Sequence, residues 1–178
     1  MRFLLPVLLF LVAACSSSKK DFESREEFEA YINDVDNGYI QSDEAGDLLF
    51  EAKLNPPLAD DPHPQFTIQM RISRLDRKPV LETNTTSKSE VLEREGYLSF
   101  DLAKDVSVEY DGKAVACVFH HYERNYGLKP SIDVFFQFPA LEDPKENPVF
   151  LYRDQQFGEG LIKIEFDKEL FTTCYVKK

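Results

Sequence analysis

The chain has 178 residues, which fits one domain with short appendages and is long enough to bury a core without metals or disulfides. Its 32 acidic and 21 basic residues give a net charge of −11, so a nucleic-acid partner is not expected, because phosphates would be repelled. Hydrophobic residues make up 43% of the chain, with 15 Phe and 8 Tyr, which is too apolar for a disordered protein.

The first 14 residues have the form of an export signal. Arg2 precedes twelve uncharged residues, 3–14, whereas a transmembrane helix needs about 20 apolar residues. The small residues Ala13 and Ala14 then stand directly before Cys15, where a signal peptidase requires small side chains. The segment therefore predicts export of the chain.

The segment Val12-Ala13-Ala14-Cys15, with Leu11 before it, resembles the lipobox of bacterial lipoproteins. The resemblance implies that Cys15 receives a diacylglyceryl group, that the chain is cut before it, and that its new amine is acylated. We expect a signal peptide over 1–14, a polar tether over 15–23 and a single β-rich domain over 24–178. The alternative is an ordinary secretory peptide that is cut near Ala14 and leaves Cys15 unmodified.

The lipid on Cys15 is the one non-protein group that we expect, and it makes the membrane the first partner. Each buried CH₂ of an acyl chain contributes about 0.8 kcal/mol, so two or three chains hold a soluble domain firmly. Ser16 is not Asp, which by the same resemblance disfavours retention in the inner membrane. The expected location is the outer membrane of a bacterial envelope, with the periplasmic face and the cell surface both open.

The domain is predicted to begin with a helix. Ser24 is a favourable N-cap and Glu27 completes a capping box, while Phe22 can staple the helix entry. Asn37-Gly38 is predicted to end the helix, because both residues tolerate positive φ. The expected apolar stripe consists of Phe28, Tyr31, Ile32 and Val35.

After the helix the hydrophobic period changes from 3.6 to 2. Asp111-Gly112 predicts a tight hairpin turn, and Ala114–Tyr122, apolar on both faces, predicts a central strand. The segment 87–94 is compatible with a second short helix. Further strands are predicted at 48–54, 66–72, 98–102, 106–110, 132–138, 149–152 and 162–166, with a closing strand over 171–176.

These short alternating segments, without helical crossovers, predict a mainly β fold: an antiparallel β-sandwich or barrel-like domain with one N-terminal helix. The order of a helix, Asp36-Asn37-Gly38-Tyr39, a strand and Asn55-Pro56-Pro57 is similar to uncharacterised Bacteroidetes lipoproteins. Phe157-Gly158-Glu159-Gly160 adds to this similarity. The similarity implies a source and a location, and no activity.

The three histidines do not predict a metal site. His63 follows Asp60-Asp61 in a proline-rich loop, where a cation site and a solvated loop are both compatible with the sequence. His120 and His121 are adjacent, so on a strand they point to opposite faces and cannot share one metal without a bend.

An aromatic and basic cluster follows the predicted central strand. Tyr122, Arg124 and Tyr126, together with His120 and His121, are candidate contacts for a sugar or a peptide. An exposed hairpin end gives the same pattern, so both interpretations stand.

Two cysteines remain once Cys15 carries lipid. In an exported protein Cys117 and Cys174 can form a disulfide, which would stabilise the fold by roughly 4 kcal/mol in the chain-entropy model. The alternative is two buried free thiols that act as small apolar residues.

No catalytic motif is present: the sequence contains no Gly-rich phosphate loop, no Gly-x-Ser-x-Gly and no His-Glu-x-x-His. The sequence therefore favours a lipid-anchored binding or interaction module with a protein or glycan partner. A structural or assembly lipoprotein of the envelope is the first alternative. An envelope hydrolase that uses carboxylates or a histidine-centred metal is the second, and it predicts a pocket around His120 or His121.

Overall fold

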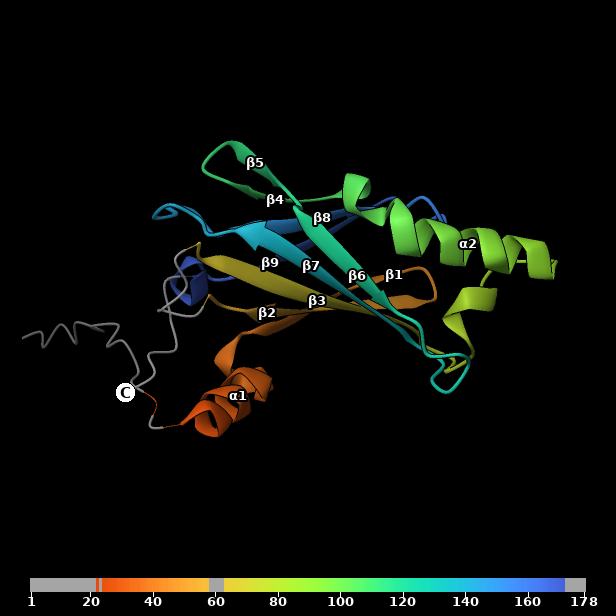
Figure 1. The fold of residues 1–178 in the computed structure, drawn as a ribbon, viewed down its shortest axis with the longest axis horizontal. Helices are drawn as coiled ribbons and strands as arrows, with labels where there is room; N and C mark the ends of the chain where they lie inside the picture. Colours follow the sequence, from red (N-terminus) through yellow and green to blue (C-terminus); the bar gives the residue numbers. More distant parts are fainter. Residues whose placement is uncertain (1–21, 23, 58–62, 172–178) are drawn as a thin grey trace, which may run out of the picture.

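The structure, a computed structural model, describes residues 22, 24–57 and 63–171. Their strands form two antiparallel sheets that pack face to face (Figure 1), which confirms the predicted mainly β sandwich. The first sheet has the order β1 (Ile40–Ala45), β2 (Leu48–Asn55), β3 (Gln65–Arg74), β7 (Ile132–Pro139) and β6 (Phe119–Glu123). The second sheet has the order β5 (Lys113–Ala116), β4 (Val106–Tyr110), β8 (Val149–Arg153) and β9 (Leu161–Glu165).

The core lies between the two sheets and is filled by aromatic side chains. Phe50 of β2 lies 6.1 Å from Tyr152 of β8, and Phe136 of β7 lies 5.7 Å from Phe150 of β8, measured between ring centroids. All four side chains are buried. Because side chains alternate along a strand, every second residue of β2, β3 and β7 points away from this core, onto the outer face of the first sheet.

The first helix, α1 (Arg25–Asn33), begins as predicted. The Ser24 hydroxyl oxygen accepts a hydrogen bond from the Glu27 backbone N–H at 3.1 Å. Phe22 packs edge-on against Phe28 with ring centroids 5.1 Å apart, which confirms the staple. Figure 1 shows α1 on the outer side of the first sheet, beside β2.

The helix ends four residues earlier than predicted. Asp34 adopts an extended conformation after Asn33, and a 3₁₀ turn, η1 (Val35–Asn37), follows before Gly38 at φ 78°. Val35 therefore leaves the predicted apolar stripe and is 66% exposed. The Asp34 side chain accepts the Asp36 backbone N–H, and this cap favours the new turn over continuation of the helix.

The strand predicted at 98–102 is wrong, because these residues end the second helix, α2 (Lys88–Phe100), and begin the turn η3 (Leu102–Asp105). The Ser87 hydroxyl oxygen accepts from the Glu90 backbone N–H, so the predicted short helix starts here but continues six residues further. Leu98 is buried and Phe100 is 76% exposed, so their alternation does not reflect a sheet face.

The single central strand predicted at 114–122 is also wrong. β5 ends at Ala116 and β6 begins at Phe119, and each lies at the edge of a different sheet. The chain crosses from one sheet to the other between them. Val118, between the two strands, is 56% exposed, so the apolar run does not reflect burial on both faces of a sheet.

The remaining elements either agree with the predictions from the sequence or were not predicted. The Asp111-Gly112 hairpin is confirmed, with φ of 47° and 72°. The polar edge strand β1 had no apolar alternation to reveal it. The closing strand was predicted over 171–176. Its first residue, Phe171, ends a 3₁₀ turn, η4 (Lys168–Phe171), and 172–176 lie outside the described residues. One further 3₁₀ turn, η2 (Val80–Glu82), lies between β3 and α2. No helix in the described ranges is long and apolar enough to cross a membrane.

Candidate functional site

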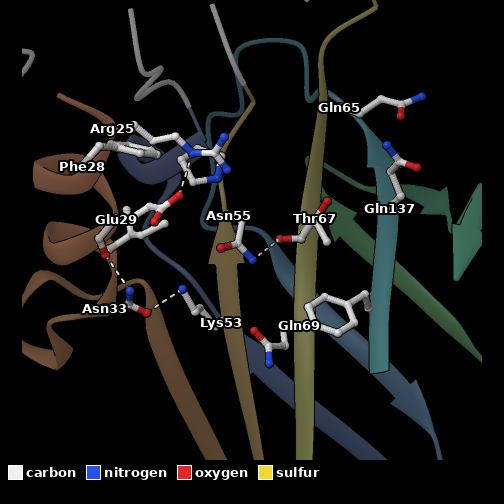
Figure 2. Close-up of a pocket in the computed structure, with 13 residues that line it drawn as sticks. Arg25, Phe28, Glu29, Asn33, Lys53, Asn55, Gln65, Thr67, Gln69 and Gln137 are labelled. Atoms are coloured by element: carbon white, nitrogen blue, oxygen red, sulfur yellow. Dashed lines mark hydrogen bonds and ion pairs between the residues drawn. The ribbon is translucent and has the colours of Figure 1, made fainter. Parts of the chain in front are cut away.

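A groove lies between α1 and the outer face of the first sheet (Figure 2), with a volume of about 500 Å³. This volume falls within the range of small-molecule sites. We name this site the α1 groove. It is lined by Arg25, Phe28, Glu29, Ile32, Asn33, Lys53, Asn55, Pro56, Gln65, Thr67, Gln69, Phe135 and Gln137.

The floor of the groove consists of two cross-strand rows of side chains. In the first row Asn55 of β2, Thr67 of β3 and Gln137 of β7 are register partners. In the second, Lys53, Gln69 and Phe135 are partners on the same three strands. Partner side chains on one face of a sheet lie about 5 Å apart at Cβ, so each row forms a continuous surface. Because β2, β3 and β7 each have a hydrogen-bonded strand on both sides, this floor is held rigidly.

The wall of the groove is the polar face of α1. Figure 2 shows Asn33 facing Lys53, whose Nζ donates a hydrogen bond to Asn33 Oδ1 at 2.6 Å. One turn earlier, Arg25 Nε pairs with Glu29 at 2.7 Å, on the exposed rim. The buried side chains Phe28 and Ile32 anchor the same helix. The wall is thus tied to the floor by one short hydrogen bond and by apolar packing.

Two amide side chains on the floor have no hydrogen-bond partner within the described residues. In the described part of the chain, neither Gln65 nor Gln137 makes a side-chain hydrogen bond. The amides of Asn55 and Gln69 make only long contacts of 3.5 Å, to the Thr67 carbonyl and to Asp133. A carboxamide offers two donors and one acceptor, so these side chains retain most of their bonding capacity for a bound molecule.

The charged side chains at the groove already have partners within the protein: Arg25 pairs with Glu29, and Lys53 donates to Asn33. Burial lowers the pKa of Lys53, and the nearby Glu29 carboxylate partly offsets this effect. Arg71, beyond the floor, donates to the buried Asp133 at 2.7 Å, and this bond raises the pKa of Arg71. The groove therefore presents mainly uncharged polar groups around one half-buried ring, Phe135.

The five ligand-contact residues that the sequence suggested do not form one site. His120 lies opposite Phe136 on the inner face of the first sheet, and its Nε2 lies 3.1 Å from the Leu98 carbonyl oxygen of α2. Tyr122 is buried on the same side of β6, and burial raises its pKa to about 12. His121 is exposed on the outer face, where it is the register partner of Phe135.

The other two members of that cluster point elsewhere. Arg124 donates to the Ser99 hydroxyl oxygen at 3.3 Å, and Tyr126, at φ 51°, projects from the loop after β6 with 86% of its surface exposed. Among the described residues no group of three or more His, Cys, Asp or Glu is placed to hold a metal, and Asp60-Asp61 beside His63 lie outside them.

Of the three cysteines the structure describes one. The Cys117 thiol is half-buried and donates to the Phe119 carbonyl oxygen at 3.0 Å, and burial raises its pKa. Cys15 and Cys174 lie outside the described residues, so the lipid anchor and the disulfide stay predictions.

Sequence reasoning identified the groove strands but not the groove. A signal was present: in a strongly acidic chain, the outward positions 65, 67 and 69 of β3 and 137 of β7 carry Gln and Thr and no acid. A purely solvated face has no reason to avoid the abundant Asp and Glu. Comparison with known proteins gives no further guide, since no family model, no curated protein and no solved structure matches the chain.

Proposed function

We propose that the protein is a lipid-anchored binding module of a bacterial cell envelope and that it binds its ligand in the α1 groove. The observation that carries this proposal is the pair of open amides, Gln65 and Gln137, on a rigid floor beside an aromatic ring. Side chains that serve only solubility are usually charged, whereas preorganised uncharged polar groups around an apolar surface are typical of binding sites.

The anchor rests on the sequence. Val12-Ala13-Ala14-Cys15 supports lipidation of Cys15, and Ser16 supports the outer membrane as the location. The similarity to Bacteroidetes lipoproteins is in line with both. The sequence predicts a tether over 15–23, and α1, which forms the groove wall, begins at Arg25.

Binding is favoured over hydrolysis by the lining of the groove. Among its described residues the one carboxylate is Glu29, which is exposed and paired with Arg25. A hydrolase that acts through general acid–base catalysis needs a positioned carboxyl or histidine with a matched pKa. A glycan or a protein segment remains as the partner class, and a purely structural lipoprotein remains the alternative function.

Metabolic labelling tests the anchor. When the chain is expressed in a bacterial host with an alkyne analogue of palmitate, we expect a labelled membrane protein. Cys15→Ala should lose the label and retain the mass of the signal peptide. Equal labelling of the two proteins, or no labelling of either, would contradict the proposed anchor.

Co-sedimentation tests binding. Full-length protein in detergent is mixed with insoluble envelope material from a Gram-negative cell, and the bound fraction is measured. We expect the double variant Gln65→Ala/Gln137→Ala to reduce binding at least fivefold, and Gln155→Ala, an exposed amide on the far loop, to leave it unchanged. Equal recovery of all three proteins would remove the groove as the binding site, and no recovery of any would support the structural alternative.

A further inference from the structure

On the basis of the proposed binding function, we infer that the ligand of the α1 groove is an uncharged oligosaccharide that lies across the strands and stacks one sugar ring on Phe135. A pyranose ring presents C–H groups on its faces and hydroxyls around its rim. The groove presents the complementary pattern, with an aromatic ring in one row and amides and a hydroxyl beside it.

The open amides match hydroxyl groups. A sugar hydroxyl donates one hydrogen bond and accepts others, and a carboxamide can serve both roles at once. Gln137 and Gln65 are diagonal neighbours on β7 and β3, because Thr67 pairs with Gln137 and Gln65 pairs with Pro139. Diagonal neighbours are about 7–8 Å apart at Cα, a spacing that allows both amides to reach one ring or two consecutive rings.

Charge favours a neutral ligand over an anionic one. An acidic sugar or a phosphate needs a cation that is free to form a charge-assisted bond. Of the described cations at the groove, Arg25 is paired with Glu29, and Lys53 donates to Asn33 while burial lowers its pKa. The net charge of the chain, −11, adds a long-range repulsion of anions.

The position of the floor disfavours an extended peptide. Peptides that join a sheet do so at an edge strand, where backbone N–H and C=O groups are free. The floor strands β2, β3 and β7 are interior strands of the first sheet, so their ladders are already occupied on both sides. Recognition at this face must use side chains.

The recognition surface is longer than one sugar. The row that holds Phe135 continues to the exposed His121 on β6, and the row that holds Gln137 continues to Phe119, which is 59% exposed. At about 4.8 Å between strands, the row from Lys53 to His121 spans roughly 14 Å. On the helix side, a second hollow of about 150 Å³ shares Asn33, Lys53 and Gln69 with the groove. An oligosaccharide can therefore contact several consecutive side chains.

Calorimetric titration of the full-length protein in detergent tests the ligand class. The probes are three neutral hexasaccharides (cellohexaose, maltohexaose and chitohexaose), one acidic hexasaccharide (hexagalacturonate) and a capped uncharged hexapeptide. We expect at least one neutral hexasaccharide to bind, and the acidic sugar and the peptide to bind at least tenfold more weakly.

Paired variants locate the site. Phe135→Leu keeps an apolar side chain and removes the ring, and we expect it to weaken binding about tenfold, while Gln137→Ala weakens it about fivefold. Phe100→Ala and Gln155→Ala, an exposed ring and an exposed amide outside the groove, should leave affinity unchanged. Circular dichroism checks that all four variants are folded.

The outcomes separate this inference from the function on which it rests. If no neutral sugar binds while co-sedimentation still depends on Gln65 and Gln137, the ligand class is wrong and the binding function stands. Tighter binding of hexagalacturonate or of the peptide also overturns the ligand class. If a neutral sugar binds equally to Phe135→Leu, Gln137→Ala and the unmodified protein, the sugar is bound elsewhere and the inference fails.

Discussion

Two polar regions of this sandwich use their hydrogen-bonding groups in opposite ways. Among the described residues, the α1 groove leaves amides without hydrogen-bond partners on the half-buried outer face of the first sheet. The region that we name the Arg94 corner, formed by Arg94 of α2 and Asp154 after β8, buries charged side chains and bonds them to backbone. The comparison shows which polar residues of this protein hold the fold and which are available to a ligand.

In the Arg94 corner each side chain holds a loop in place. The Arg94 guanidinium donates to the carbonyl oxygens of Leu81, Thr83 and Gln156 at 2.6–2.8 Å and lies 4.6 Å from the Phe157 ring centroid. These bonds join α2, the turn η2 and the loop after β8. Because the donors and acceptors are out of water, the loss of one partner leaves the other unsatisfied.

Asp154 has the same role in the loop after β8. Its carboxylate accepts backbone N–H groups of Gln156, Phe157 and Glu159 at 2.8–3.1 Å, and it also accepts the Tyr152 hydroxyl at 3.0 Å. None of this bonding capacity remains for an external molecule. In the groove, by contrast, Gln65 and Gln137 are free to bond outward, at little cost to the fold if they are removed.

The largest effect is expected at the Arg94 corner. Arg94→Met fills most of the same volume but leaves three carbonyl oxygens without their donor, so the free energy of unfolding should fall by about 3 kcal/mol. Urea denaturation followed by circular dichroism measures the change. Arg124→Met is the control: it removes an exposed arginine whose one hydrogen bond within the described residues is to the Ser99 hydroxyl, so it should change stability by under about 0.5 kcal/mol. Equal losses for the two variants would contradict the structural role of the corner.

A smaller effect separates two buried tyrosines. The Tyr152 hydroxyl donates to Asp154, whereas the Tyr122 hydroxyl has no hydrogen-bond partner among the described residues. We expect Tyr152→Phe to lower the free energy of unfolding by about 1 kcal/mol. Tyr122→Phe should leave it equal or raise it by about 0.5 kcal/mol, because it removes an unsatisfied buried hydroxyl. Matched thermal and urea denaturation compare the two variants, and a larger loss for Tyr122→Phe would show that its hydroxyl has a partner.

The sequence predicted those elements whose neighbours in the chain determine them. The cap of α1 at Ser24 and the hairpin at Asp111-Gly112 are local, and both are confirmed. The strands β3 and β7 are visible because one face of each is buried, which produces apolar alternation. The end of α2 and the break between β5 and β6 depend on contacts with distant parts of the chain, so the local pattern was misleading at both places.

The groove could not be derived for the same reason. Its floor combines residues 53–55, 65–69 and 135–137, and its wall comes from α1, so only the strand order and register bring them together. The sequence shows uncharged residues at the outward positions 65, 67 and 69 of β3 and 137 of β7, but it could not show that these positions face a helix. The cluster of Tyr122, Arg124 and Tyr126 was more conspicuous in the sequence, yet the fold buries Tyr122 and leaves Tyr126 exposed.

The smallest effect is expected in the groove itself, and it completes the comparison. Gln65→Ala and Gln137→Ala remove side chains that make no hydrogen bond within the described residues, so each should change the free energy of unfolding by under about 0.5 kcal/mol. Asn33→Ala serves as the contrasting variant, since it removes the acceptor of Lys53 and should cost about 1 kcal/mol. Urea denaturation of the three variants measures these differences. If Gln137→Ala is as destabilising as Asn33→Ala, the amide belongs to the fold, as Arg94 does, and the case for a ligand at this face loses its main support.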